Sequence, residues 1–149
     1  MPSASIKKKI PCSKKNLIKI VLDIEKYPEF VPWCLDGKIH DEADKGDTIE
    51  IKADLTIGRS FFKETYKSFV IYNKSKDLIH VTNMDGPLKH LKNEWFFKQI
   101  GDSSEIDFQV DFELKNKILN ILMIKSFDLG LKKIANAFEK RAIQLFKKN

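Results

Sequence analysis

Apolar and polar residues alternate along two long stretches of the chain, residues 48–57 and 104–114. Successive side chains of a β-strand point to opposite faces of a sheet, so each alternation predicts a strand with one face on the core and one in water. The residues predicted to point inward are Ile49, Ile51, Ala53, Leu55 and Ile57 in the first stretch and Ile106, Phe108, Val110, Phe112 and Leu114 in the second. This pattern is typical of an antiparallel sheet.

Further strands are predicted at residues 5–10, 37–41, 61–72, 78–84 and 91–100, with turns at 45–47, 58–60 and 85–87. Stretch 61–72 alternates poorly, so its inner face stays unassigned. In stretch 5–10, Lys7 and Lys9 point outward, and Lys8 on the apolar face is interpreted as an edge effect. The outward face of stretch 104–114 is acidic, which favours pairing of the first strand with the last.

Helical spacing of apolar residues predicts two helices. The first covers residues 14–26, with Ser13 as its N-cap, and must stop before Pro28. The second occupies the end of the chain, and its apolar stripe consists of Phe127, Leu131, Ile134, Phe138, Ile143 and Leu145. Gly130 interrupts this stripe and is interpreted as a point of close packing against the sheet.

Residues 27–34, which we name the aromatic–proline turn, combine three aromatic residues with two prolines. Proline fixes its own backbone and biases the preceding residue toward extended geometry, so Tyr27 and Val31 are expected to be extended. The turn should therefore be stiff and present its aromatic side chains in a fixed arrangement. Two interpretations stay open, a plug for one end of the core and the rim of an apolar pocket.

Composition narrows the classes of function. A chain of 149 residues predicts one domain, and its net charge of +6 comes almost wholly from lysine, since Arg59 and Arg141 are the only arginines. Base recognition favours arginine, so sequence-specific nucleic-acid binding is not expected. Attraction to anionic lipid or to ribosomal RNA stays open. No apolar run is long enough to span a bilayer, and the first residues carry no signal-peptide core.

Catalytic and metal-binding patterns are missing from the sequence. Cys12 and Cys34 lack metal-ligand and CxxC spacing and are expected to be reduced thiols. His80 and His90 could face each other across the turn at residue 86, but no third ligand accompanies them. Glu29 is expected on the surface or in an ion pair rather than as a base. We therefore predict that the chain is not an enzyme and holds no metal.

Three motifs carry a resemblance to a known family. They are Tyr27-Pro28-Glu29-Phe30-Val31-Pro32-Trp33-Cys34, then Asp85-Gly86-Pro87 followed by Trp95 and Phe97, and finally Ala137-Phe138-Glu139-Lys140-Arg141-Ala142. In this order, and over about residues 6–146, the chain resembles the coenzyme Q-binding, START-like family, which also includes ribosome association toxins and polyketide cyclases. The family motif usually has phenylalanine where this chain has Leu88, which leaves the shape of the ligand open.

The resemblance implies an α+β helix-grip fold, a curved antiparallel sheet wrapped around a long C-terminal helix, with residues 1–149 as a single START-like lipid-binding domain. A curved sheet covered by one long helix also leaves space between the two layers. An apolar ligand is expected there. The expected ligand-binding residues are Tyr27, Phe30, Val31, Pro32, Trp33, Leu55, Ile57, Trp95, Phe97, Phe127, Leu131, Ile134 and Phe138.

For function, the resemblance implies binding of ubiquinone or a related isoprenoid lipid in support of respiratory electron transport, as a carrier or chaperone. Ubiquinone would be a bound ligand, and no cofactor is expected. The alternative is a toxin that binds the large ribosomal subunit and blocks subunit joining; a polyketide cyclase or aromatase is the least favoured. The expected location is the cytoplasm, with a peripheral position on the inner membrane left open. There Phe30, Val31 and Trp33 would contact anionic lipid.

Overall fold

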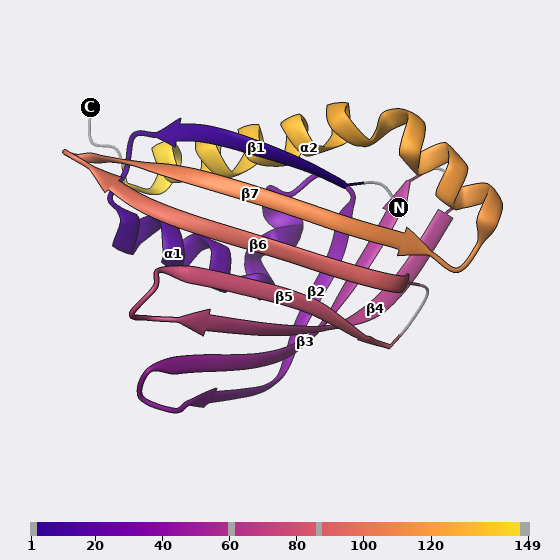
Figure 1. Ribbon diagram of the computed structural model, residues 1–149, viewed down its shortest axis with the longest axis horizontal. Helices are drawn as coiled ribbons and strands as arrows, with labels where there is room; N and C mark the ends of the chain where they lie inside the picture. Colours follow the sequence, from indigo (N-terminus) through magenta and orange to yellow (C-terminus); the bar gives the residue numbers. More distant parts are fainter. Residues whose placement is uncertain (1–2, 60–61, 86–87, 147–149) are drawn as a thin grey trace.

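The computed structural model of the chain describes residues 3–59, 62–85 and 88–146, and within these ranges all side chains except those of residues 59, 62, 84, 85, 88, 112, 119 and 122–128. The described residues form one antiparallel sheet in the order β1-β7-β6-β5-β4-β3-β2, curved around a long C-terminal helix (Figure 1). This is the predicted helix-grip arrangement, which is confirmed.

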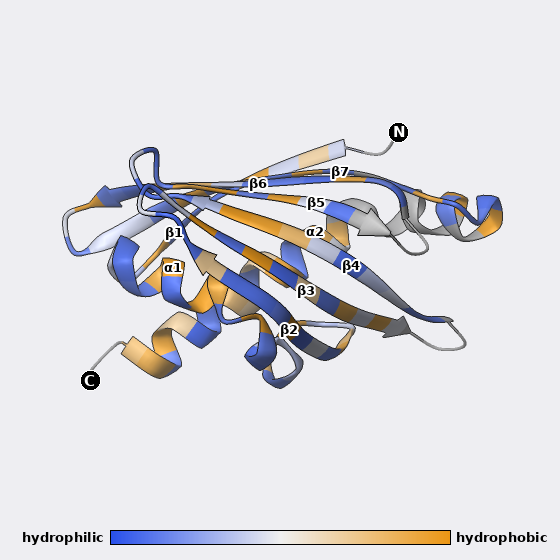
Figure 2. Cartoon of the chain, turned by 90° about the horizontal axis from the view of Figure 1, so that it is seen from below, coloured by the Kyte–Doolittle hydropathy of each residue, from blue (hydrophilic) through white to orange (hydrophobic). Residues whose placement is uncertain are grey.

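The strands are β1 (Ser3–Ile10), β2 (Cys34–Asp44), β3 (Thr48–Arg59), β4 (Phe62–Asn73), β5 (Leu78–Asp85), β6 (Leu88–Ile100) and β7 (Ser103–Leu114). The helices are α1 (Lys14–Leu22), a short 3₁₀ helix (Ile24–Glu29) and α2 (Lys117–Phe146). Both α-helices lie on the same face of the sheet (Figure 1). Edge strand β2 is mostly hydrophilic (Figure 2), and most of its residues are exposed.

The predicted pairing of the first strand with the last is confirmed. In the register of β1 with β7, Lys7 lies opposite Asp107 and Lys9 opposite Glu105. Lys8 points to the helix side of this edge strand, where its Nζ lies 3.4 Å from Glu139 Oε1 on α2. Because β1 is an edge strand, the Lys8 side chain reaches Glu139 and is not buried.

The alternation of β3 and β7 is confirmed where the structure describes the side chains, with Ile51, Ala53, Ile106 and Phe108 buried. The turn expected at residues 58–60 is wrong for its first two positions. The β3–β4 ladder continues through Gly58 and the backbone of residue 59. Residues 60, 61, 86 and 87 lie outside the described residues, and with them most of the turn expected at 85–87.

The N-cap of α1 is confirmed, because Ser13 Oγ accepts a hydrogen bond from the backbone N–H of Asn16 at 3.2 Å. The helix nevertheless ends at Leu22 and not near residue 26, and Tyr27 lies in the 3₁₀ helix together with Pro28. The expectation that Tyr27 is extended is wrong. Its hydroxyl donates to the carbonyl of Val21, and its own carbonyl accepts from Val31 N at 2.8 Å, which together outweigh the bias of a following proline.

The apolar stripe of α2 differs from the prediction at its end. Ile143 and Leu145 are exposed, whereas Ala142 is buried and Phe146 packs against the core. Positions 138, 142 and 146 follow the 3.6-residue period more closely than 143 and 145 do. Gly130 makes a close approach, but to the Trp33 ring and not to the sheet, since a Cβ built on it would lie 3.4 Å from that ring.

Candidate ligand-binding cavity

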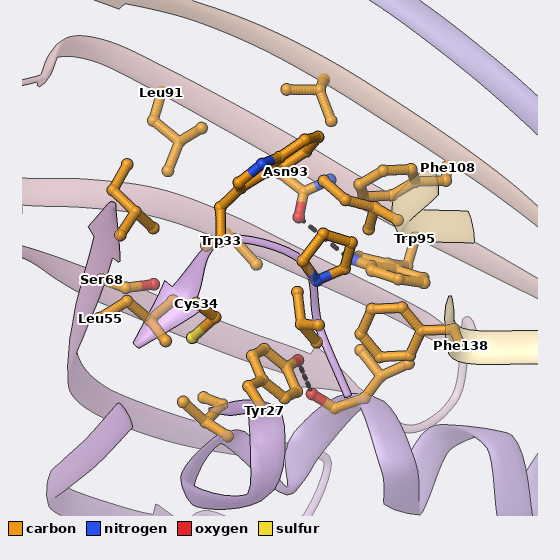
Figure 3. Close-up of a pocket in the computed structure, with 18 of the residues that line it drawn as sticks. Tyr27, Trp33, Cys34, Leu55, Ser68, Leu91, Asn93, Trp95, Phe108 and Phe138 are labelled. Carbon is orange, nitrogen blue, oxygen red and sulfur yellow. Dashed lines mark hydrogen bonds between the residues drawn. The ribbon is translucent and has the colours of Figure 1, made fainter. Parts of the chain in front are cut away.

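A cavity of about 300 Å³ lies between the inner face of the sheet, the aromatic–proline turn and α2. Figure 3 shows Trp33 from the turn, Trp95 from β6 and Phe138 from α2 arranged around it. Most of the predicted ligand-binding residues that the structure describes line this space. They are Tyr27, Val31, Pro32, Trp33, Leu55, Ile57, Trp95, Leu131, Ile134 and Phe138.

Phe30 and Phe97 do not line the cavity, and the side chain of Phe127 lies outside the described residues. Phe30 packs behind the wall, with its ring centroid 5.1 Å from that of Phe138 and 5.0 Å from the Arg141 guanidinium carbon. Phe97 is buried in the main core and stacks on Trp95 at 6.3 Å. Both residues support the cavity from outside.

Aromatic rings hold the three walls together. The ring centroid of Phe138 lies 4.9 Å from that of Trp95 and 5.6 Å from that of Tyr27, both in edge-to-face geometry. Such pairs add about 0.5–1.5 kcal/mol each beyond the burial of their surface. The cluster therefore fixes α2 against both β6 and the aromatic–proline turn.

Trp33 bridges β3 and α2. Its backbone is left-handed, with φ at 64°, and its carbonyl accepts a hydrogen bond from Gly58 N at 2.9 Å. This unusual backbone directs the indole across to Gly130, where the missing side chain leaves room for it. Lys133 Nζ lies 5.9 Å from the centroid of the Trp33 ring. Trp33 is thus a half-buried wall of the cavity, held at its backbone and at its ring.

Most polar groups of the cavity wall already have partners. Asn93 Oδ1 accepts from Trp95 Nε1 at 2.9 Å, and Asn93 Nδ2 donates to the carbonyl of Gln109 at 3.0 Å. Cys34 Sγ donates to the carbonyl of Asp36 at 3.6 Å. Ser68 is different: its hydroxyl is fully buried and has no hydrogen-bond partner among the described residues.

Ser68 and Asn93 were missed at the sequence level. Both are polar residues at inward positions of strands, and Ser68 sits between Tyr66 and Val70 on the inner face of β4. Stretch 61–72 alternates poorly because polar Ser68 lies on the inner face while apolar Phe69 and Ile71 lie on the outer face, opposite Lys52 and Glu50. The register with β3, which places Ser68 opposite Ala53, would have identified the inner face.

The cavity is electrically neutral. Burial raises the pKa of Tyr27 and of Tyr66 far above the usual tyrosine range, and it raises the pKa of Cys34 to about 11. All three groups therefore keep their protons near neutral pH. No lining residue that the structure describes has a carboxylate, amine, guanidinium or imidazole side chain. A charged ligand would find no counter-charge there.

Several ionisable groups outside the cavity are paired with one another. Arg141 Nη2 lies 2.9 Å from Glu29 Oε1, which confirms the expectation of an ion pair. His80 lies opposite Glu94 in the β5–β6 ladder, with Nδ1 3.4 Å from Oε2, so it does not face His90, which the sequence had left as a possibility. Across the described part of the chain, no group of three potential ligands could hold a metal ion. The helices of that part are also not long and apolar enough to cross a membrane.

The sequence matches a known protein family over most of its length. A family model described as polyketide cyclase / dehydrase and lipid transport matches residues 12–139. The chain is 32% identical over 141 residues to the ribosome association toxin RatA of Rickettsia prowazekii, covering 93% of this chain and 94% of that protein. It is also 32% identical over 135 residues to the mitochondrial coenzyme Q-binding protein COQ10 of Dictyostelium discoideum, covering 88% of this chain and 64% of that protein.

Among solved structures, the 18 kDa protein CC1736 of Caulobacter crescentus superposes with a TM-score of 0.81 at 29% identity. The match covers 99% of this chain and 100% of that one. The likeness therefore extends over the sheet, the aromatic–proline turn and α2 together.

Proposed function

We propose that this chain, which belongs to the polyketide cyclase / dehydrase and lipid transport family, binds a neutral isoprenoid lipid of the quinone type in the cavity between its sheet and α2. The observation that carries the proposal is the lining, in which the described residues are almost all apolar and none is charged. Transfer of an ion into such a site without a partner is costly, so neutral lipids are favoured over fatty acid anions.

The size of the cavity suits one end of such a lipid. About 300 Å³ lies at the lower end of the range for small-molecule sites. A quinone ring with the first part of its tail fits this space, whereas a long polyisoprene tail does not. The rest of the tail would leave the cavity or stay in a bilayer. The net charge of +6 favours peripheral contact with anionic lipid, in keeping with a carrier or chaperone at the inner membrane.

The proposal is one of binding and not of catalysis. A general base must reach the proton that it removes, and the described lining offers no carboxylate or imidazole for this. The buried tyrosines keep their protons, because their pKa is raised by burial. A cyclase reaction would lack acid–base groups among these residues.

A second candidate function is binding to the large ribosomal subunit. It is favoured by the relative named ribosome association toxin RatA, which matches over 94% of its length, against 64% for the coenzyme Q-binding relative. Exposed lysines on α2, such as Lys132, Lys133 and Lys140, offer positive charge for RNA phosphates. If the chain binds the ribosome, the cavity is not the site of that binding.

One experiment distinguishes the two candidate functions. The chain is purified without detergent from a quinone-producing bacterium. Organic extracts are analysed by mass spectrometry, and the lysate is sedimented to detect the chain on large ribosomal subunits. We expect a co-purified isoprenoid quinone. If the wild-type chain carries no lipid and sediments with large ribosomal subunits, the quinone proposal is wrong and ribosome binding is the supported function.

A matched pair of variants tests the site of binding. Val31→Lys introduces an amine at the cavity wall and should abolish the co-purified quinone while the protein stays folded. Leu35→Lys adds the same charge four residues later, at a side chain that is 53% exposed and outside the described lining, and should retain the lipid. Equal loss in both variants would mean that charge, and not the cavity, controls retention.

A further inference from the structure

We propose that the hydroxyl of Ser68 hydrogen-bonds the oxygen-bearing end of the ligand, so that the cavity selects neutral isoprenoid ketones, quinones or alcohols over hydrocarbons of the same shape. The inference rests on the proposed function, because it concerns the ligand of the same cavity. It adds the residue that recognises the ligand and the chemical group that is recognised.

The first observation is the state of the hydroxyl. Ser68 is 0% exposed, and its Oγ has no hydrogen-bond partner among the described residues. Buried hydroxyl groups in folded proteins are rarely left without a partner, since the lost bonds to water are then not replaced. A partner that arrives with the ligand accounts for the exception, because Ser68 lines the cavity.

Ser104 provides an internal comparison. It is also 0% exposed, but its Oγ donates to the carbonyl of Cys12 at 2.8 Å, and it lies outside the described lining. The same residue type at the same burial is therefore satisfied in the closed core and unsatisfied at the cavity. Burial of a serine in this fold does not by itself leave its hydroxyl without a partner.

A ligand atom can contact Ser68 only after neighbouring side chains shift, because this residue lines the cavity but is itself 0% exposed. Its neighbour across the β3–β4 ladder is Ala53, one of the smallest side chains available. Figure 3 shows Ser68 beside Leu55, with Cys34 and Trp33 on the same side of the sheet. The amide of Asn93 and the hydroxyl of Tyr27 are occupied by protein partners, so they compete less for the ligand.

The chemistry of the hydroxyl defines the ligand class. A serine can donate to a carbonyl oxygen or accept from a ligand hydroxyl. It cannot neutralise a carboxylate, and no described lining residue can either. Tyr66, two residues away and lining the same cavity, is the competing donor and must be tested beside Ser68.

The test measures binding of two probes to wild type and three variants, Ser68→Ala, Ser104→Ala and Tyr66→Phe. The probes are a ubiquinone with two isoprene units and β-farnesene, an isoprenoid hydrocarbon without oxygen. The two tryptophans of the chain, Trp33 and Trp95, both line the cavity, so quenching of their fluorescence reports quinone binding. Farnesene is measured by its displacement of the quinone.

Ser68→Ala should weaken quinone binding about 3- to 10-fold, the range expected for one lost hydrogen bond, and leave farnesene affinity unchanged. Without ligand, its melting temperature should equal or exceed that of wild type, because an unsatisfied group has been removed. Ser104→Ala should do the opposite, with normal binding and a lower melting temperature. Tyr66→Phe should change the ratio of the two affinities by less than Ser68→Ala does.

Three results would overturn the inference. Equal quinone affinity in Ser68→Ala and wild type would remove Ser68 as the recognising group and leave the proposed function intact. Loss of quinone selectivity in Tyr66→Phe alone would assign recognition to Tyr66. Wild type whose tryptophan fluorescence is not quenched by the quinone would refute the quinone proposal and the role of Ser68 together.

Discussion

Replacement of Gly130 by alanine tests how tightly Trp33 is held against α2. Glycine in the interior of a helix costs about 0.8–1.0 kcal/mol relative to alanine, so the substitution begins with a gain of that size. The new Cβ would lie 3.4 Å from Cη2 and Cζ3 of Trp33, at the near limit of ordinary van der Waals contact. Two such contacts add about 0.2–0.4 kcal/mol when the ring does not have to move.

The sum predicts that Gly130→Ala stabilises the protein by about 1 kcal/mol, which corresponds to a rise of about 2–4 °C in melting temperature for a chain of this size. Quinone affinity should stay within a factor of about two, because the ring that lines the cavity is retained. Thermal unfolding followed by circular dichroism, together with tryptophan quenching, measures both quantities.

Gly46→Ala is the matched control, for which we expect a change in melting temperature of the opposite sign. No atom lies within 4 Å of a Cβ built on Gly46, but its φ is +90°, where an L-residue is strained by about 1–2 kcal/mol. This turn variant should therefore melt below wild type although it has more space than Gly130→Ala. A destabilised Gly130→Ala would refute the reasoning, since it would show that the Trp33 ring cannot tolerate the contact.

Two further predictions concern ionisable groups. The hydrogen bond from Arg141 lowers the pKa of Glu29, so this carboxylate contributes stability above its unfolded pKa of about 4.3, and the contribution is lost as pH falls through the folded value. Glu29→Gln should therefore melt lower than wild type at pH 7, and the difference should shrink at pH 3; a constant difference would contradict the linkage. Burial raises the pKa of Cys34 to about 11, so iodoacetamide should label it slowly at pH 8, and bound quinone should slow the reaction further. Labelling of Cys12, which does not line the cavity, serves as the internal control in the same peptide map, and equal protection of both thiols would argue against binding in the cavity.

The sequence predicted those parts of the fold that depend on a simple period. Alternation in β3 and β7 identified their inner faces, and the opposite charges of Lys7 and Asp107 indicated that β1 pairs with β7. Both features follow from local geometry, since neighbouring strand residues point to opposite faces. Most of the expected cavity residues were found because the resemblance named the aromatic–proline turn and the end of α2.

The remaining features of the fold and of the cavity depend on contacts that cannot be read from the periodicity of apolar residues. Tyr27 takes a helical conformation because its hydroxyl reaches Val21, and Trp33 takes a left-handed one because β3 and α2 hold it from two sides. Ser68 was overlooked because a polar residue on the inner face of a strand breaks the alternation from which that face would be identified. For Tyr27 the preference of the residue before a proline gives way to hydrogen bonds with Val21 and Val31, and for Trp33 the usual backbone preference gives way to contacts with distant parts of the chain.

The order of strands in the sheet has a consequence for folding. From β2 to β7 every neighbour in the sheet is also the next strand in the sequence, so this meander can form by successive closures of short hairpins. Strand β1 is the exception, because Ile6 faces Phe108 about a hundred residues away. During synthesis the first strand emerges long before its partner, and closing so large a loop is slow. We therefore expect β1 to dock last, when β7 and α2 already present the surface that it completes.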